Sequence, residues 1–159
     1  MALKSQTHIY VMNFKQFLET WLYHGTSKAA ADSIQKNGID VSNYRSGLYK
    51  GFYLAPRLSY FLHSKQPEAI LAFNIDPSKL LDADKVTDDE LEAFDATFDH
   101  RSRHHPYYRY GVTTRMAQAN GYMGITHRGG AEVIIFDNRI VKAIREVPVG
   151  GIEPPTFSI

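Results

Sequence analysis

Near its C-terminal end the chain reads GGAEVIIFD (residues 129–137), in which a glutamate opens a run of four large apolar residues. Such a run, bounded by Gly-Gly and by Asp137, predicts a buried β-strand around Val133–Phe136. A carboxylate at the start of a buried strand can be partly desolvated and carry a chemical task, and it can equally be an edge charge that discourages strand aggregation. The Gly-Gly pair allows a tight turn beside Glu132, which favours the functional interpretation.

Two earlier segments also place a polar side chain at the edge of an apolar strand. The first is LYHGT (residues 22–26), where a ligand could approach the glycine backbone while the His24 ring supplies a hydrogen bond. The second is GFYLA (residues 51–55), in which Tyr53 should face the side opposite its two apolar neighbours and could stack on a planar ligand. Each has a plain structural alternative: a histidine that caps a turn, and an ordinary strand aromatic.

Outward from these segments, the pattern predicts short strands with short helices between them. Strands are expected at Trp21–Tyr23, Phe52–Ala55, Ala69–Ile75, Met123–Thr126, Val133–Phe136 and Val141–Val147. Two early helices are expected, from Ser27 to a stop at Gly38 and from Pro56 to Leu62. A third should follow the capping box at Thr87–Glu90, since Leu91, Phe94 and Phe98 keep helical spacing, and a fourth should cover Val112–Asn120 before Gly121. Loops are expected at 39–50 and 99–111. Regular long helices between parallel strands are missing from this pattern, so a split α+β domain is expected rather than a doubly wound α/β fold.

Composition is that of one globular domain, predicted over residues 1–149, with a disordered tail at 150–159 rich in Gly and Pro. Of the 159 residues, 43% are hydrophobic and 22% are charged, and the formal net charge of +1 gives no basic field of the kind that marks nucleic-acid binders. The sequence has no cysteine, which excludes a disulfide scaffold, a thiolate nucleophile and a Cys-ligated metal. Apolar runs such as Ala69–Phe73 are far shorter than the roughly 20 residues that span a bilayer. No membrane association and a cytoplasmic location are therefore expected.

Taken together, the order His24, Tyr53, Glu132 resembles the ADP-ribosyltransferase superfamily, in the branch with a His-Tyr-Glu signature shared by diphtheria-type toxins and poly-ADP-ribose polymerases. The matching strings are Tyr23-His24-Gly25-Thr26, Ala30 with Ile34 to Gly38, Gly51 to Ala55, Gly121 to Ile125, and Glu132 to Asp137, within a resemblance that covers residues 20–147. The resemblance implies an ADP-ribosyltransferase-like fold, in which two small, mainly antiparallel β-sheets form a split core with short flanking helices.

The same resemblance implies that NAD is the co-substrate and that three catalytic side chains surround it. His24 would hydrogen-bond the adenosine ribose, and Tyr53 would stack on the nicotinamide. Glu132 would contact the nicotinamide-side ribose and stabilise the positive charge that develops there.

Further NAD contacts are implied by position. The backbone of Gly25 would hold the carboxamide, Thr26 would support the turn, and Ser59 and Tyr60 are candidates for the serine and second aromatic that usually follow the tyrosine segment. The chemistry needs no metal, because nicotinamide is already a cationic leaving group and one carboxylate can stabilise an oxocarbenium-like state.

The acceptor is the least determined part of this hypothesis. Arginine-modifying members carry a second acid two positions before the catalytic glutamate, where this chain has Gly130, so the resemblance does not support that branch. Retention of Glu132 leaves chain elongation open, but a lone small domain is expected to transfer a single ADP-ribose to a macromolecule, protein or nucleic acid, and such an enzyme could act as a toxin or effector.

Residues 100–110, from His100 to Tyr110, interleave basic and aromatic side chains and could contact the acceptor. They could follow a phosphate backbone, hold the NAD pyrophosphate, bind a protein, or form a solvated loop. His100, His104 and His105 in this segment are a poor metal site, because Pro106 should break a helix there and the segment contains no carboxylate. His63 and His127 are expected on the surface.

Three alternatives stay open. Within the same fold, an RNA 2'-phosphotransferase also consumes NAD, although that family normally carries an additional N-terminal module, and plain NAD hydrolysis would use water as the acceptor. From another class, a non-catalytic module could bind a protein or nucleic acid through residues 99–111, although His24 and Glu132 are both retained.

Overall fold

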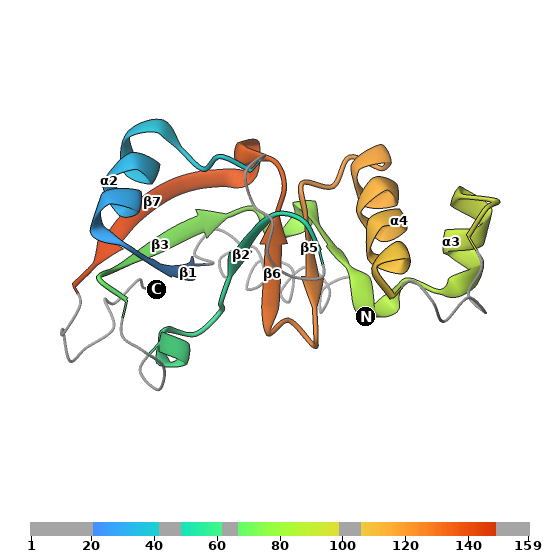
Figure 1. Cartoon of the computed structure of the whole chain (residues 1–159), viewed down its shortest axis with the longest axis horizontal. Helices are drawn as coiled ribbons and strands as arrows, with labels where there is room; N and C mark the ends of the chain where they lie inside the picture. Colours follow the sequence, from blue (N-terminus) through green and yellow to red (C-terminus); the bar gives the residue numbers. More distant parts are fainter. Residues whose placement is uncertain (1–20, 42–48, 62–66, 99–105, 149–159) are drawn as a thin grey trace, which may run out of the picture.

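A computed structural model describes residues 21–41, 49–61, 67–98 and 106–148 of the chain, and these form an α+β architecture with two β-sheets (Figure 1). In chain order the helices and strands are β1 (Trp21–Thr26), α2 (Lys28–Asn37), β2 (Phe52–Leu54), β3 (Ala69–Ile75), β4 (Leu80–Asp82), α3 (Asp88–Phe94), α4 (Pro106–Ala119), β5 (Gly124–His127), β6 (Glu132–Ile135) and β7 (Val141–Val147). The short 3₁₀ helices are η1 (Leu58–Phe61), η2 (Pro77–Lys79), η3 (Ala83–Lys85) and η4 (Asn138–Ile140). The expected α+β class and the predominance of antiparallel pairing are confirmed.

The first sheet has the order β1-β3-β7, and both pairings are antiparallel. Strand β3 lies in the middle and is buried at six of its seven positions, which explains its almost continuous apolar sequence AILAFNI. Helix α2 packs against β3 and β7 at one end of the molecule (Figure 1).

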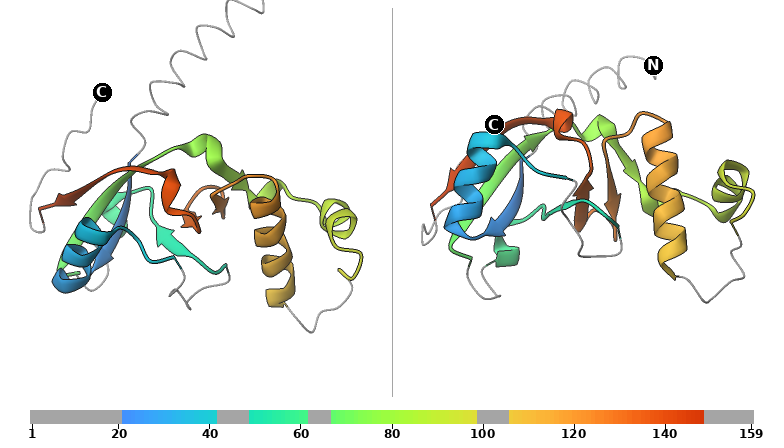
Figure 2. Two further views of the ribbon diagram at one scale, coloured as in Figure 1. Left: turned by 90° about the horizontal axis from the view of Figure 1, so that it is seen from above. Right: turned by 45° about the horizontal axis from the view of Figure 1, so that its top comes forward.

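The second sheet has the order β2-β6-β5-β4, with an antiparallel β2-β6-β5 unit and a parallel pairing of β4 with β5. Helix α4 packs against β5, and α3 packs against α4 at the end of the molecule farthest from α2 (Figure 2). In β2 the side chains alternate as expected, with Phe52 and Leu54 buried in one cluster and Tyr53 packed on another.

The two sheets meet where β1 passes the end of β2. Tyr23 and Ala55 exchange two backbone hydrogen bonds, each 2.8 Å long, in an isolated antiparallel bridge. One apolar cluster continues across this junction, since it combines Leu22, Leu71 and Phe73 of the first sheet with Phe52 and Val133 of the second. The two sheets therefore share this core cluster, while further clusters lie on their other faces.

Local signals explain the helix ends that the sequence predicts correctly. The Ser27 hydroxyl accepts a hydrogen bond from the Ala30 N–H at 3.1 Å, and Gly38 ends α2 with φ of 81°. Thr87 and Glu90 form the expected capping box of α3.

Other helix predictions are wrong. Helix α4 begins at Pro106, whereas the sequence predicted a loop through residue 111, because proline lacks only an N–H that the first turn leaves unpaired in any case. Helix α3 ends at Phe94, so Phe98 is not helical, although it is buried and stacked on Tyr108 with ring centroids 5.8 Å apart. The helix expected from Pro56 is the shorter η1.

Strand β4 was not predicted, because its three residues carry no periodic pattern. The predicted tail at 150–159 and most of the predicted 39–50 loop lie outside the described residues. No helix among those that the structure describes is long and apolar enough to cross a membrane.

Candidate functional site

His24 lies beside the main chain of β2. Its Nδ1 is 2.9 Å from the carbonyl oxygen of Tyr53, and its ring lies 4.1 Å from that of Phe52, centroid to centroid. A carbonyl oxygen only accepts, so Nδ1 carries the proton and Nε2 of the neutral ring is left as an acceptor. Burial lowers the pKa of His24, and the Tyr53 carbonyl opposes this only in part, so the ring is neutral at pH 7.

Tyr53 is fixed by its hydroxyl. The phenol donates to the Tyr49 carbonyl oxygen at 2.8 Å and accepts from the Tyr49 N–H at 2.9 Å, which ties the segment before β2 back onto the strand. The ring lies on the same face of the second sheet as Ile134, its cross-strand partner. The hydroxyl is thus engaged in structure, and the ring is the part that a ligand could contact.

Glu132 is the first residue of β6 and lies one strand away from Tyr53. The register pairs Tyr53 with Ile134 and Leu54 with Val133, and side chains two positions apart on a strand share a face, so Glu132 and Tyr53 lie on one face of the sheet. The carboxylate is 31% exposed and its Oε1 is 3.3 Å from Nη1 of Arg128. It is therefore open to a ligand at the start of β6, an inner strand of the sheet.

These contacts bring the three predicted residues to one region of the fold. His24 touches the main chain of Tyr53 directly, and Glu132 follows on the neighbouring strand, close to the Tyr23–Ala55 bridge between the sheets. The His24 ring, however, packs on Phe52, whose side chain points to the other face of β2 from Tyr53. The imidazole and the phenol ring therefore flank the strand.

The glycine of the LYHGT segment is needed for packing. A Cβ on Gly25 would lie 2.9 Å from Cγ of Pro67 and 3.0 Å from Cδ1 of Phe61, so the chain's own side chains approach this backbone closely. Thr26 ends β1 opposite Ala69. The sequence predicted that a ligand could approach this backbone closely, but in the structure Phe61 and Pro67 occupy the space beside Gly25.

The turn between β5 and β6 is held by a carboxylate that the sequence did not single out. Asp84 of η3 accepts hydrogen bonds from the backbone N–H of Arg128 at 3.1 Å and of Gly129 at 2.6 Å, and from Nδ1 of His127 at 3.2 Å. These bonds, that from Gly129 first, lower the pKa of Asp84, so it is charged at neutral pH. Asp84 and the residues of this turn are more than forty positions apart in the sequence, and the parallel pairing of β4 with β5 brings them together.

The expectation that His127 is a surface residue is wrong. Its side chain is only 17% exposed and lies in edge contact with the rings of Tyr49 and Tyr110, at 5.2 and 6.1 Å between centroids. Strand alternation explains this, because His127 shares the buried face of β5 with Ile125.

The remaining residues that the sequence singled out either lie outside the described part of the chain or have a structural role. The side chains of Ser59 and Tyr60 in η1, and residues 99–105 with His100, His104 and His105, lie outside the described part. Arg109 is inside it, and it binds Asp88 and the Val86 carbonyl oxygen, so it holds α4 to α3. The described ranges contain no group of three His, Asp or Glu side chains that could hold a metal ion.

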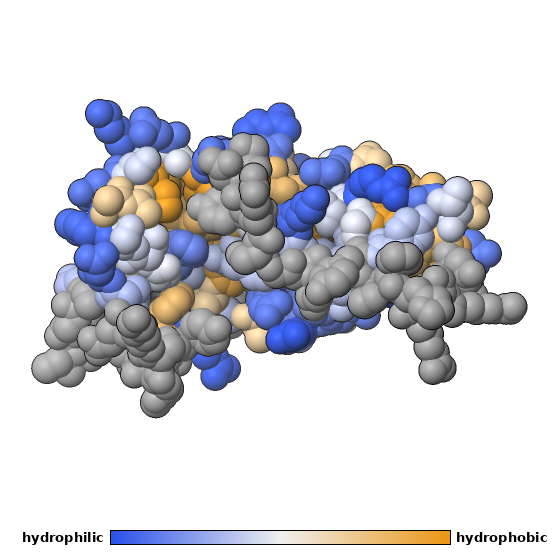
Figure 3. Space-filling view, viewed as in Figure 1, coloured by the Kyte–Doolittle hydropathy of each residue, from blue (hydrophilic) through white to orange (hydrophobic). Residues whose placement is uncertain are grey.

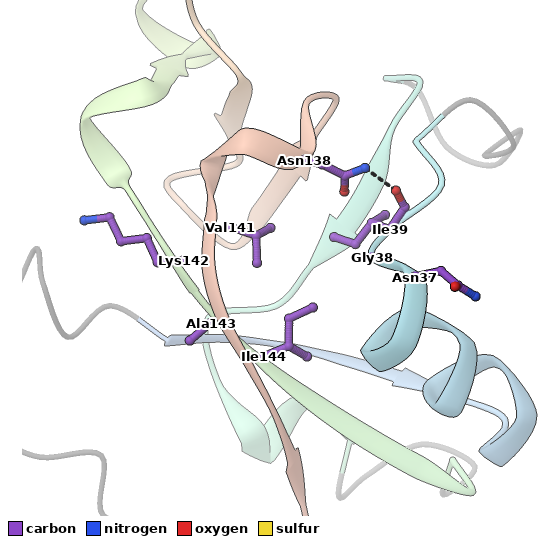
Figure 4. A pocket seen from close by; sticks show the side chains of 8 residues that line it. All are labelled: Asn37, Gly38, Ile39, Asn138, Val141, Lys142, Ala143 and Ile144. Carbon is purple, nitrogen blue, oxygen red and sulfur yellow. Dashed lines mark hydrogen bonds between the residues drawn. The ribbon is translucent and has the colours of Figure 1, made fainter.

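A separate pocket of about 310 Å³ lies between the end of α2 and β7 (Figure 4). It is lined by Asn37, Gly38, Ile39, Asn138, Val141, Lys142, Ala143 and Ile144. The space-filling view shows apolar colour between the hydrophilic residues in this region, at the upper left (Figure 3). None of the three predicted catalytic residues lines this pocket.

Comparison with protein-family models, with curated proteins and with solved structures finds no match to this chain.

Proposed function

We propose that this protein is an NAD-dependent ADP-ribosyltransferase that transfers one ADP-ribose to a macromolecule. The observation that carries the proposal is the 2.9 Å contact between the His24 ring and the Tyr53 carbonyl oxygen, one strand away from Glu132. Three segments that are far apart in the sequence thus lie near the junction of the two sheets, with His24 on one face of β2 and Tyr53 and Glu132 on the other. Two small, mainly antiparallel sheets that share a core cluster also support the proposal, because an ADP-ribosyltransferase-like fold has a split two-sheet core.

The neutral His24 ring suits the binding of a ribose. With Nδ1 donating to the Tyr53 carbonyl, Nε2 accepts a hydrogen bond from a ribose hydroxyl, and the Phe52 ring holds the imidazole in place. A charged imidazolium would lose this acceptor. The lowered pKa of His24 therefore keeps it in the binding form at neutral pH.

Glu132 suits the bond-breaking step. As the bond between ribose C1' and the nicotinamide nitrogen breaks, its electron pair goes to the pyridinium ring and positive charge develops on the ribose. The Glu132 carboxylate at the start of β6 stabilises this charge, and the nearby Arg128 orients it. The Tyr53 ring, fixed through Tyr49, offers a flat surface to the nicotinamide.

The test is nicotinamide release from NAD, with and without cell lysate, together with label transfer from NAD labelled in the adenylate phosphate. Wild type should release nicotinamide, and Glu132→Gln should lower the rate by at least about 100-fold. Glu146→Gln is the matched control, since Glu146 is a strand glutamate of similar exposure, 35%, on β7. It should retain the wild-type rate.

The outcomes separate the candidate functions. Label on lysate macromolecules supports transfer, whereas release without label identifies a hydrolase. If wild type releases no nicotinamide under any acceptor condition, the proposal is wrong and a binding module is the better account.

A further inference from the structure

His127 faces Glu132 across the β5–β6 pair. The two residues are direct partners in the antiparallel register, so their side chains share a face with Cβ atoms about 5 Å apart. On the other side, Nδ1 of His127 is 3.2 Å from Oδ1 of Asp84. The His127 imidazole thus binds the carboxylate of Asp84 and lies opposite Glu132 on the neighbouring strand, the residue to which the proposed function assigns the bond-breaking step.

This arrangement defines the state of the ring. Asp84 is charged and only accepts, so it holds the proton of His127 on Nδ1 and leaves Nε2 as a base. The same carboxylate fixes the backbone of the turn that follows, so the ring is attached to a rigid support. The rings of Tyr49 and Tyr110 also face His127. Burial raises the pKa of Tyr49 to about 12, so its phenol stays neutral beside the ring.

We propose that His127 is the general base of the transfer step and that the acceptor is a hydroxyl group of a protein. This inference rests on the proposed function. Once nicotinamide has left, an oxygen lone pair of the hydroxyl forms the new bond to C1', and its proton passes to Nε2 of His127. The imidazolium keeps its Nδ1–H bonded to Asp84 and then loses the Nε2 proton to water.

The chemistry of the acceptor follows from the need for a base. A carboxylate acceptor has no proton to lose at neutral pH and would gain nothing from an Asp–His pair beside the reacting carbon. A hydroxyl has a proton that must leave as the bond forms. A protein acceptor is favoured over nucleic acid because the net charge of +1 gives no general attraction for phosphate backbones.

The first experiment uses wild-type protein, labelled NAD and cell lysate. The label should be released by protease and not by nuclease, and it should resist neutral hydroxylamine, which cleaves esters formed on carboxylates. Release by hydroxylamine or by nuclease overturns the inference, while the proposed function stands as long as nicotinamide is released. An absence of nicotinamide release overturns both.

The second experiment measures how the reaction divides between acceptor and water. In His127→Ala, the bound label per nicotinamide released should fall by about 100-fold, because the acceptor hydroxyl loses its base while water, as the bulk solvent, is in large excess around the cation. Added imidazole should restore the bound label in His127→Ala and not in Glu132→Gln. Lys36→Gln, an exposed change on α2, controls for general effects and should match wild type.

A structural role for His127 gives a different pattern. It would lower nicotinamide release and bound label together, with no rescue by imidazole, and that result overturns the inference. If His127→Ala does not fold, as measured by thermal unfolding, the hydroxylamine test on wild type still decides the acceptor class.

Discussion

His24 shows how burial and one hydrogen bond together set the state of a side chain. Its ring lies against Phe52 and donates to the Tyr53 carbonyl, and burial outweighs that bond in its effect on the pKa. A histidine whose pKa is lower in the folded state takes up its proton more readily when unfolded. Between the two pKa values, the unfolded chain therefore binds more protons, and stability rises with pH.

The consequence is a measurable loss of stability in mild acid. As the pH falls below about 6.5, the ordinary pKa of histidine, the free energy of unfolding should decrease by up to about 1.4 kcal/mol per pH unit until the folded ring is protonated too. His24→Asn keeps a donor near the Tyr53 carbonyl and has no titrating ring, so this part of the slope should vanish. Urea unfolding of both proteins between pH 5 and 8 measures the difference, and identical slopes would contradict the assigned environment of His24.

The sequence predicts the individual residues that place a polar group within or beside an apolar strand. His24, Tyr53 and Glu132 each interrupt an apolar run, which is why they can be found without a structure. Asp84 and His127 cannot be found this way, since their partners are backbone N–H groups and a residue 43 positions away. The positive φ of 66° at Gly129, which turns its N–H toward Asp84, leaves only the Gly-Gly pair as a sequence signal.

Among helices and strands, the most accurate predictions are those whose first and last residues have capping or apolar patterns that can be recognised in the sequence. Helix α2 is bounded by a serine cap and a glycine stop, and β3 and β7 have the predicted bounds. Helix α4 was predicted too short because Pro106 was interpreted as a helix breaker, and Gly111, inside the helix, as part of a loop. Proline is tolerated at the first position of a helix and disrupts its interior, and glycine can end a helix or lie within it at a cost in stability. The position of each residue within the helix therefore has to come from the structure.

Two glycine substitutions test these element boundaries with opposite signs. A Cβ on Gly51, which precedes β2 with φ of 155°, would lie 2.6 Å from Cγ2 of Ile134 and 2.7 Å from the carbonyl oxygen of Ile135. Gly51→Ala should therefore lower the free energy of unfolding by about 2 to 4 kcal/mol. Gly111 is exposed in α4 with open space around it, so Gly111→Ala should raise this free energy by about 0.5 to 1 kcal/mol.

Chemical denaturation of the two variants and wild type gives both values. A loss of stability in Gly111→Ala would mean that α4 does not extend through that residue. A neutral effect in Gly51→Ala would mean that β2 does not approach β6 as closely as the register requires.

On the scale of the whole molecule, the split sheet raises the question of how many cooperative units it contains. Only the Tyr23–Ala55 bridge joins the two sheets by backbone hydrogen bonds among the described residues. The shared apolar cluster is the stronger link, because Phe52 of the second sheet contacts Phe73 of the first, with ring centroids 5.5 Å apart, and both rings are fully buried. Cores built from both sheets should unfold together.

Phe52→Ala tests whether the two sheets unfold cooperatively, and it also removes the ring that packs on His24. Deleting a fully buried ring should cost about 3 to 5 kcal/mol, and it should accelerate amide hydrogen exchange equally at Leu71 in β3 and at Ile134 in β6. Phe94→Ala is the control, since Phe94 is 39% exposed at the end of α3 and its loss should change stability much less. If exchange accelerates at Ile134 alone, the sheets are separate units. In that case the contact between His24 of the first sheet and Tyr53 of the second would depend on how the two sheets dock. A ligand that binds both sheets should then restore slow amide exchange in β6.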